Sequence, residues 1–346
     1  MKSPRPRIAP VVWQPPPVPP RSSQPHGPIP MPRPALHTLP GKGPEDVVVD
    51  GEGRVLAGLE DGRIVRVSPA DGSVETLADT GGRPLGVELD ADGSLVVCDA
   101  HRGLLRVDPG TGTVRELVGA SELIDGRPLR VCNNAAIARD GAIWFSDSSA
   151  RFALEHWKGD LIEHSGTGRL LRRDPGGRVE VMLSGLHFAN GVALAADESF
   201  VVVAETGAYR LTRLWLSGPD AGRSDVLVDN LPGFPDNIAR GTDGLIWIAI
   251  GSPRNATLDL LAPRPPVLRK MLWALPEALL PKPADTVWVQ AVDERGRLVH
   301  DLQTTTPGFS MVTGVREHAG AVWLGSLQST AIATFAVPPP DSGQIQ

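Results

Sequence analysis

The feature of this sequence that most constrains its fold is an internal repeat of predicted strands. One series of segments joins a strand, an Asp- or Gly-rich turn and a more hydrophobic strand, as in "VELDADGSLVVCDA" and "VALAADESFVVVAE". A second series, such as "HRGLLRVDPGTGTVRELV", joins two strands through a turn of Asp, Pro and Gly. Alternating apolar residues separated by such turns are typical of β-hairpins. The two series together predict a repeating unit of four strands.

Such units, each about 40 to 50 residues long, fill the chain between residues 45 and 337. Four-stranded units repeated around an axis form a β-propeller. The sequence therefore predicts an all-β protein, a six-bladed β-propeller with four-stranded antiparallel blades and a central axial site. To close the ring, we expect the last unit to take a strand from near the N-terminus. The units begin near Glu45, Leu85, Cys132, Asn190, Asp236 and Met311.

Two segments depart from the repeat. Residues 1–43 are rich in proline ("PPPVPPRSSQPHGPIPMPRP"), which has a fixed φ and no backbone donor, so we expect an arm that is extended across the domain or disordered. Residues 252–283 form an insertion in the fifth unit, and its "VLRKMLWALPEALL" has the apolar spacing of a short helix or lid. The predicted organisation is an arm over 1–43, a propeller over 44–338 and a C-terminal tail over 339–346.

Composition narrows the classes of partner and location. The net charge of −6, without a basic cluster interleaved with aromatic residues, argues against a nucleic-acid partner. No apolar run is long enough for a membrane span, and no apolar core of a secretory signal is recognised, so a cytoplasmic location is expected. Cys98 and Cys132 both adjoin apolar strand-like runs, and we expect two buried, reduced thiols, with a disulfide as the alternative.

Oxygen-bearing side chains recur where four of the units begin. In a propeller the first strand of each blade lines the central channel, and its start points to one mouth of that channel. Carboxylates and carboxamides without sulfur suit Ca²⁺, and two carboxylates about neutralise a divalent ion. We therefore predict a Ca²⁺ site, with Zn²⁺, Mn²⁺ and Mg²⁺ left open and polar plugs bonded across the channel as the alternative. The predicted ligands are Glu45, Asn133, Asn190 and Asp236.

Specific motifs then add a family resemblance. The segments "FPDNI", "NGV" and "DSS", within about residues 41 to 336, resemble the strictosidine synthase-like proteins, a group within the assemblage of gluconolactonases, senescence-marker lactonases, diisopropyl fluorophosphatase and paraoxonases. The resemblance implies a six-bladed propeller with an axial divalent cation, usually calcium, and its ligand positions fall on the same four residues. Asn134 stands where most relatives carry aspartate, which alters a contact beside the ligands.

The chemistry expected at such a site is hydrolysis. A cation with open coordination positions can polarise a carbonyl or phosphoryl oxygen and activate water. We therefore expect a calcium-dependent enzyme that hydrolyses a small lactone or other ester, with Asp236 as ligand and as nucleophile or base, as relatives imply. His187 and His101, at positions where relatives often carry tyrosine, are the candidate catalytic acid/base residues, or else hydrogen-bonded loop histidines. Glu205 and Asp147 are expected to bind neighbouring backbone.

Two other functions are alternatives to hydrolysis for a propeller of this kind. The condensing reaction of strictosidine synthase needs a glutamate late in the last blade, and that position falls on Thr313, so this chemistry is not expected; Glu317, beside a turn, is expected to be exposed. A non-enzymic propeller that binds a ligand or partner is the second alternative, because fold alone does not decide function. Trp273 and the leucines of the insertion suggest a partly apolar pocket wall and a hydrophobic substrate. The oligomeric state is left open.

Overall fold

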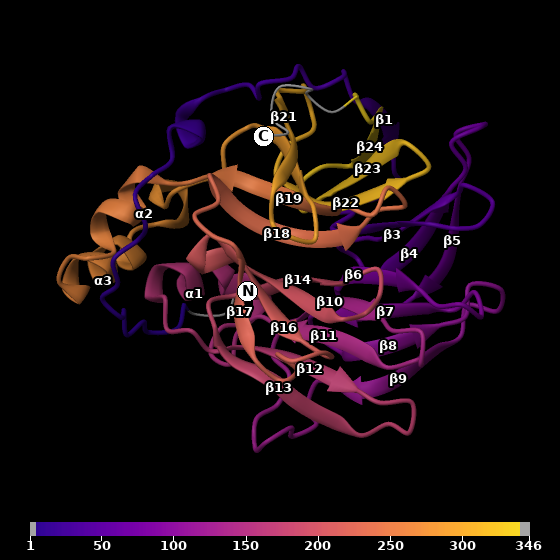
Figure 1. Cartoon of the computed structure of the whole chain (residues 1–346), viewed down its shortest axis with the longest axis horizontal. Helices are drawn as coiled ribbons and strands as arrows, with labels where there is room; N and C mark the ends of the chain where they lie inside the picture. The colour runs from indigo at the N-terminus through magenta and orange to yellow at the C-terminus, as the bar shows by residue number, and fades with distance from the viewer. Residues whose placement is uncertain (1–4, 340–346) are drawn as a thin grey trace.

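A computed structural model describes residues 5–339 and confirms the six-bladed propeller with four-stranded antiparallel blades (Figure 1). The innermost strands β2, β6, β10, β14, β18 and β22 contact one another in a closed ring. The first three blades are β2–β5 (Val47–Val49, Val55–Gly58, Arg63–Val67, Val74–Asp79), β6–β9 (Pro84–Leu89, Leu95–Asp99, Gly103–Val107, Val114–Gly119) and β10–β13 (Cys132–Ile137, Ile143–Asp147, Gly168–Arg173, Val179–Leu186).

The other three blades complete the circle. The sixth blade joins both ends of the chain, because β1 pairs antiparallel with β24, Ala35 opposite Thr334, and so supplies the expected closing strand. These blades are β14–β17 (Ala189–Leu194, Phe200–Glu205, Arg210–Trp215, Ser224–Val228), β18–β21 (Gly233–Arg240, Ile246–Pro253, Val287–Val292, Leu298–Thr304), and β22–β24 with β1 (Val312–His318, Ala321–Ser326, Ala331–Ala336, Ala35–Thr38).

Burial follows the position of a strand within its blade. The second strands β7 and β15 are buried throughout and consist mainly of apolar residues. In the outer strand β5, most residues are exposed or half-buried. Apolar side chains of adjacent blades pack between the sheets, as where Ile238 of one blade joins the cluster around Val202 of the blade before it. The core is therefore spread between the blades, which leaves polar residues free to occupy the axis.

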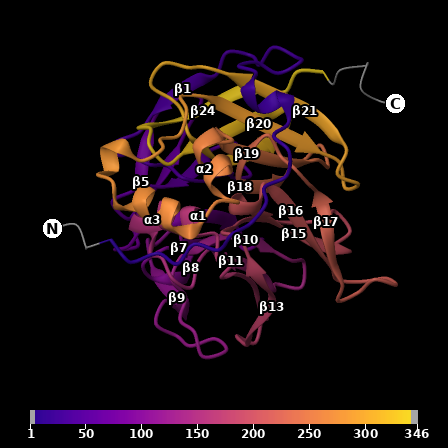
Figure 2. The same cartoon turned by 90° about the vertical axis from the view of Figure 1, so that its left-hand side faces the viewer.

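Helices gather on one side of the propeller (Figures 1 and 2). The insertion between β19 and β20 contains α2 (Ala256–Leu261), α3 (Pro266–Ala274) and the 3₁₀ turn η4 (Glu277–Leu279), which confirms the predicted helical insertion. Asn255 caps α2 by accepting from two backbone N–H groups, and α3 starts with Pro266, where the absent donor costs nothing. The sequence analysis missed α1 (Trp157–Glu163), which follows η2 (Leu154–His156) between β11 and β12. The remaining turns are η1 (Pro20–Ser23) and η3 (Thr206–Ala208).

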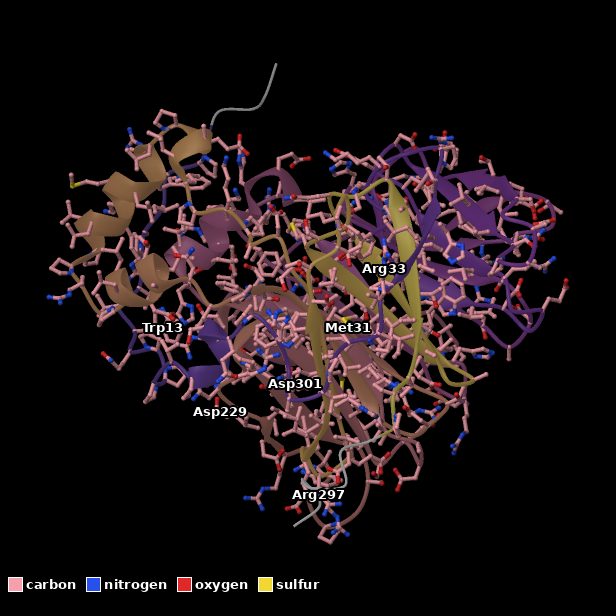
Figure 3. The ribbon with its side chains drawn as sticks, turned by 90° about the horizontal axis from the view of Figure 1, so that it is seen from above. Trp13, Met31, Arg33, Asp229, Arg297 and Asp301 are labelled. Carbon is pink, nitrogen blue, oxygen red and sulfur yellow. The ribbon has the colours of Figure 1, made fainter. Side chains whose placement is uncertain are left out.

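The described part of the proline-rich segment lies along the surface rather than forming a sheet of its own. It passes the helices, where the Val11 N–H donates to the Glu163 carbonyl at 2.9 Å, and then crosses to the fifth blade, where Arg21 pairs with Asp301. Figure 3 shows this course from Trp13, beside the helices, to Met31 near the strands of the last blade. Residues 1–4, and all but the first residue of the predicted tail over 339–346, fall outside the described part.

Two expectations about the chain as a whole can be compared with the structure. Among residues 5–339, no helix is long and apolar enough to cross a membrane. Cys98 and Cys132 are both buried and free, as expected.

Candidate metal centre

Three of the four predicted oxygen donors sit at β-bulges in the innermost strands, and the fourth, Glu45, lies just before β2. The pairing of β10 with β11 shifts between Cys132 and Ala135, and that of β14 with β15 shifts between Ala189 and Val192. The pairing of β18 with β19 shifts again just before Ile238. A bulge places two residues opposite one and re-aims their side chains. Asn133, Asn190 and Asp236, which the sequence repeat singled out, therefore lie where the regular strand pairing is interrupted.

All four predicted ligands, Glu45, Asn133, Asn190 and Asp236, line one pocket. The first three are almost completely buried, and Asp236 keeps some exposure towards the pocket. Gly251 lies beside that carboxylate, and a Cβ at this glycine would meet Asp236 Oδ2 at 3.4 Å. The structure thus brings together the whole predicted ligand set from four different blades.

The carboxamides are oriented with their oxygens free. Thr206 donates its hydroxyl proton to the Pro235 carbonyl at 2.7 Å, so its oxygen can only accept from Asn190 Nδ2, at 3.2 Å. Asn133 Nδ2 likewise donates to Ser148 Oγ at 3.0 Å. The Oδ1 atoms of Asn133 and Asn190 are buried and have no hydrogen-bond partner within residues 5–339. Buried carbonyl oxygens without partners are costly, and a cation is the group that would satisfy them.

The two carboxylates lie close together without an ion pair, although Arg83 and Asn237 partly stabilise the charge of Glu45 and the Asn190 side chain that of Asp236. Among residues 5–339, neither Glu45 nor Asp236 forms an ion pair within 4.0 Å. Burial, then Asp236 and Asp46, raises the pKa of Glu45 well above its usual value. Burial chiefly, with a further contribution from Asp46, raises the pKa of Asp236 to about 7. No group of three His, Cys, Asp or Glu side chains in the described residues forms a metal site, so any cation here depends on the carboxamides.

A second layer of polar residues lies one position further along the bulges. Asn134 Nδ2 donates to Asp46 Oδ2 at 3.1 Å, and its Oδ1 accepts from the Val192 N–H at 2.9 Å, so one carboxamide links three blades. Asn237 Nδ2 donates to Glu45 Oε2 at 3.1 Å. The sequence analysis missed Asp46, although its place directly after Glu45 matches that of Asn134 after Asn133.

Glycines alternate with these polar residues around the axis. A Cβ at Gly191 would lie 2.1 Å from the Ile238 nitrogen, and one at Gly314 would lie 2.7 Å from the Asp46 Cα. Gly86 approaches Asn134 of the next blade in the same way, at 2.7 Å from its Cα. Because real Cβ atoms do not approach so closely, only glycine lets every second blade pack this closely against the innermost strand of the next blade. This close approach holds the ring of oxygen donors together.

The pocket above the donors is mostly apolar. It has an empty volume of about 920 Å³, counted out to its open mouth, and it includes Lys158 and Lys282 among its lining residues. Trp273, which the sequence suggested as part of the wall, packs behind it in a cluster with Phe152 and Ile8. Apolar walls come from the blades, from α1 and from the insertion, and include Leu85, Leu161, Phe188, Phe234, Leu258, Pro281 and Met311.

The two candidate histidines lie away from this lining. His101 has a side chain that is 48% exposed, and its Nε2 lies 2.9 Å from Glu155 Oε1. His187 stacks on His164 with ring centroids 3.9 Å apart, and its backbone N–H donates to Glu205. Neither imidazole is among the residues that line the pocket of the oxygen donors. Their acid/base role stays a prediction, and the geometry brings neither of them to the four ligands.

Several other predicted roles can be compared with observed contacts. Asp147 accepts from two backbone N–H groups and pairs with Arg169, and Glu205 accepts from a backbone N–H, which confirms their expected structural role. Thr313 lines the pocket, and its hydroxyl donates to the Glu45 carbonyl at 2.7 Å. The expectation that Glu317 is exposed is wrong: it is 2% exposed and accepts from the backbone of the turn at residues 242–243. Those N–H groups repay the cost of burying its charge.

Comparison with known proteins places this geometry in a family. Residues 133–219 match the family described as strictosidine synthase, and residues 35–67 match the N-terminal family of strictosidine synthase-like proteins. The chain is 34% identical over 313 residues to the adipocyte plasma membrane-associated protein of Gallus gallus, covering 84% of this chain and 74% of that one. It is 35% identical over 317 residues to protein STRICTOSIDINE SYNTHASE-LIKE 10 of Arabidopsis thaliana, covering 82% and 83%.

Solved structures share the fold at lower identity. A gluconolactonase from Xanthomonas campestris is 18% identical, with a TM-score of 0.61 over 91% of this chain and 99% of that one. The calcium-binding protein regucalcin from Agrobacterium tumefaciens is 14% identical, with a TM-score of 0.59 over 86% and 94%. At these identities the likeness concerns the fold alone.

Proposed function

Because the chain belongs to the strictosidine synthase-like family, we propose that it is a divalent-cation-dependent hydrolase of lactones or other esters, with calcium as its cation. The observation that carries the proposal is the pair of buried carboxamide oxygens without partners, on Asn133 and Asn190, in the same pocket as two unpaired carboxylates. Glu45 and Asp236 supply the negative charge, and the two asparagines supply neutral oxygens. This donor set fits the oxygen preference of calcium.

Different residues of the pocket would bind the cation, react with the substrate, orient the ligands and bind the substrate. A divalent cation bound by the four donors would polarise the carbonyl oxygen of an ester. Asp236, the only one of the four with some exposure to the pocket, acts as nucleophile or accepts a proton from the attacking water. Thr206 and Ser148 hold the amide nitrogens, so that the oxygens of Asn190 and Asn133 face the site. The apolar walls bind the hydrophobic part of the substrate and exclude water.

Structural neighbours support this choice of reaction class. The solved gluconolactonase and regucalcin share the propeller, and their names associate it with lactone hydrolysis and with calcium. Condensation of an amine with an aldehyde, the reaction of strictosidine synthase, lacks its carboxylate at Thr313, whose hydroxyl is committed to the Glu45 carbonyl. We therefore favour hydrolysis of a partly hydrophobic lactone or ester over condensation.

The test combines binding and turnover. Thermal unfolding would be followed with Ca²⁺ and with EDTA, and hydrolysis of γ-lactones, phenyl acetate and a phosphotriester would be measured in parallel. We expect calcium to raise Tm and EDTA to abolish turnover of at least one lactone or ester. A rise in Tm without turnover of any substrate would instead indicate a ligand-binding propeller. An unchanged Tm and metal-independent turnover would contradict the proposed site.

The same assay tests the two histidines. His187→Gln and His101→Gln would each lower kcat strongly if either imidazole supplied the acid or base. From the pocket geometry, we expect both variants to keep most of their activity, and Asp236→Asn to lose it. A collapse of kcat in one histidine variant, with Tm unchanged, would restore that histidine to the mechanism.

A further inference from the structure

The insertion in the fifth blade exposes an unusual number of large apolar side chains. Leu260, Met271 and Leu279 are 60%, 63% and 65% exposed, which is more than most apolar residues of the described chain. We call the whole set the lid face; it consists of Leu260, Val267, Leu268, Met271, Leu275 and Leu279. Contiguous exposed apolar surface of this kind marks an interaction site in a soluble fold.

Helix α3 shows why this surface lacks a partner. Its inward side packs on α1 and the N-terminal arm, where Trp273 (7% exposed) clusters with Ile8 and Ile162 and Arg269 (2% exposed) donates to the Ile162 carbonyl. Its outward side carries Val267, Met271 and Leu275. A helix that is apolar on both sides is normally buried on both sides. One side of α3 is therefore covered by α1 and the arm, and the other faces solvent in the isolated chain.

The N-terminal arm widens the same surface. Val11 accepts a hydrogen bond at its carbonyl from Arg269 at 2.6 Å, which fixes this part of the arm against α3. The side chains of Val11 and Val12 are 49% and 53% exposed. The arm that carries these exposed valines runs beside the insertion helices (Figure 2).

Charge around the lid face is basic although the chain is acidic. Arg264, Lys270 and Lys282 are exposed within residues 252–283, where Glu277 is the one exposed acidic residue; Asp285 is exposed just before β20. The chain as a whole has a net charge of −6. An apolar helix face bordered by lysine and arginine suits a bilayer with anionic lipid, since the side chains enter the acyl region while the cations meet the headgroups.

The composition of the lid face favours a bilayer over a protein partner. Protein interfaces concentrate tryptophan, tyrosine and arginine at their centres. Five of the six lid-face residues are leucine or valine, the sixth is a methionine of the kind that protein interfaces also favour, and the neighbouring Trp273 is buried. In addition, Leu258, Pro281 and Lys282 of the same insertion line the pocket, so the docked surface would border the pocket mouth.

We infer that the lid face docks peripherally on membranes that contain anionic lipid. The helices lie in the interface plane, with the apolar side chains of α2, α3 and η4 in the outer acyl region and Lys270 and Lys282 at the headgroups. This inference is independent of the proposed reaction, because it needs neither the metal nor turnover.

The test is flotation of the full chain with vesicles of phosphatidylcholine alone and with about 30% phosphatidylserine. We expect the chain to float with the anionic vesicles, with or without EDTA, and to float less as salt is raised. Met271→Glu combined with Leu279→Glu should lower the bound fraction about tenfold or more, because a charge then enters the acyl boundary. Lys270→Gln with Lys282→Gln should weaken binding to anionic vesicles only.

Two exposed apolar residues on outer strands serve as matched controls. Val226 of β17 and Leu298 of β21 are 43% and 39% exposed, and Val226→Glu with Leu298→Glu should float like the parent chain. Failure of the parent chain to float, or equal loss in this control, would overturn the inference. It would also be overturned by light scattering that shows a dimer which Met271→Glu with Leu279→Glu dissociates, because the lid face would then bind a second copy.

Discussion

The hydroxyl of Thr206 lies 3.2 Å from Asn190 Nδ2 and donates its own proton to the Pro235 carbonyl, which turns the carboxamide oxygen of Asn190 towards the pocket. Thr206 is not itself a predicted ligand, but this contact determines that the oxygen of Asn190, and not its nitrogen, faces the site. The carboxamide of Asn133 is held in the same way by Ser148.

Replacing Thr206 should therefore weaken the metal site without removing a ligand. Thr206→Val leaves the Asn190 amide free to rotate, and we expect the affinity for Ca²⁺ to fall about 10- to 100-fold. Titration calorimetry measures this. Thr212→Val is a matched control, since Thr212 is also buried but its hydroxyl contacts Glu205, away from the donors. Equal affinities in the parent and both variants would show that Asn190 needs no such support.

Asp236→Asn should remove a charge and the proposed reactive oxygen together. We expect lactone or ester hydrolysis to fall at least about 100-fold, with Tm in EDTA unchanged or higher, because the repulsion between the Glu45 and Asp236 carboxylates is removed. Asp225→Asn, on the exposed side of β17, controls for the general effect of the substitution. Retained activity in Asp236→Asn would contradict the proposed mechanism.

Gly191→Ala should disrupt the close contact between the fourth and fifth blades. The added Cβ would lie 2.1 Å from the Ile238 nitrogen, so the strands must separate, and we expect a loss of about 3 kcal/mol or more in the free energy of unfolding. Gly51→Ala is the control, because nothing lies within 4 Å of its added Cβ. Chemical denaturation of both variants compares them, and equal stabilities would show that the blades need no close approach here.

His164 should make stability depend on pH. Its ring stacks between Trp13 and His187, and burial chiefly, then His187, Arg269 and Arg210, lowers its pKa to about 2. The folded chain thus keeps this imidazole neutral, while the unfolded chain protonates it below about pH 6.5. The neutral imidazole therefore contributes fully to the free energy of unfolding above about pH 6.5, and this contribution is lost as the pH falls below that value.

Between pH 7 and pH 5 the loss amounts to about 2 kcal/mol. Urea denaturation at both pH values measures it, and His164→Phe should reduce the difference by that amount. The change with pH is the readout, because the positive φ of residue 164 makes phenylalanine costly at any pH. An unchanged pH dependence in this variant would assign the effect to other groups.

The N-terminal arm should stabilise the helices α1 and α3 beside the pocket. Its Pro6 carbonyl accepts from Trp273 Nε1 at 2.9 Å, and its Val11 carbonyl accepts from Arg269. Deleting residues 1–13 should speed hydrogen exchange in α1 and α3 and raise KM more than it lowers kcat. Arg21→Gln, which releases the arm only at the fifth blade, where Arg21 contacts Asp301, Gln303 and Trp288, is the control. Unchanged exchange in α1 and α3 after the deletion would show that the helices stand without the arm.

The sequence predicted those parts of the fold that repeat. Strand periodicity and turn residues recur in every blade, so the blade number and the convergence of Glu45 with Asn190 followed from register, whereas the helical insertion followed from its own apolar spacing. Contacts between blades carry no such periodic signal. The contact of Asn134 with Asp46 joins residues 88 positions apart, and the burial of Glu317 depends on a turn 74 positions earlier, at Asp243.

The histidines illustrate the same limit. His187 stands three residues before Asn190 in the sequence, yet the loop turns its ring back onto His164 and Trp13. That direction is set by α1 and by the arm. The sequence analysis did not predict α1, and it assigned the arm no contact partner. The sequence therefore located the predicted ligand Asn190, but it did not show which way the ring of the nearby His187 points.

The most direct test of the central claim is a crystal structure of the chain grown with ample Ca²⁺. We predict a single strong density peak within about 2.3 to 2.6 Å of side-chain oxygens of Glu45, Asn133, Asn190 and Asp236. Water alone between these four side chains, at saturating calcium, would contradict the account.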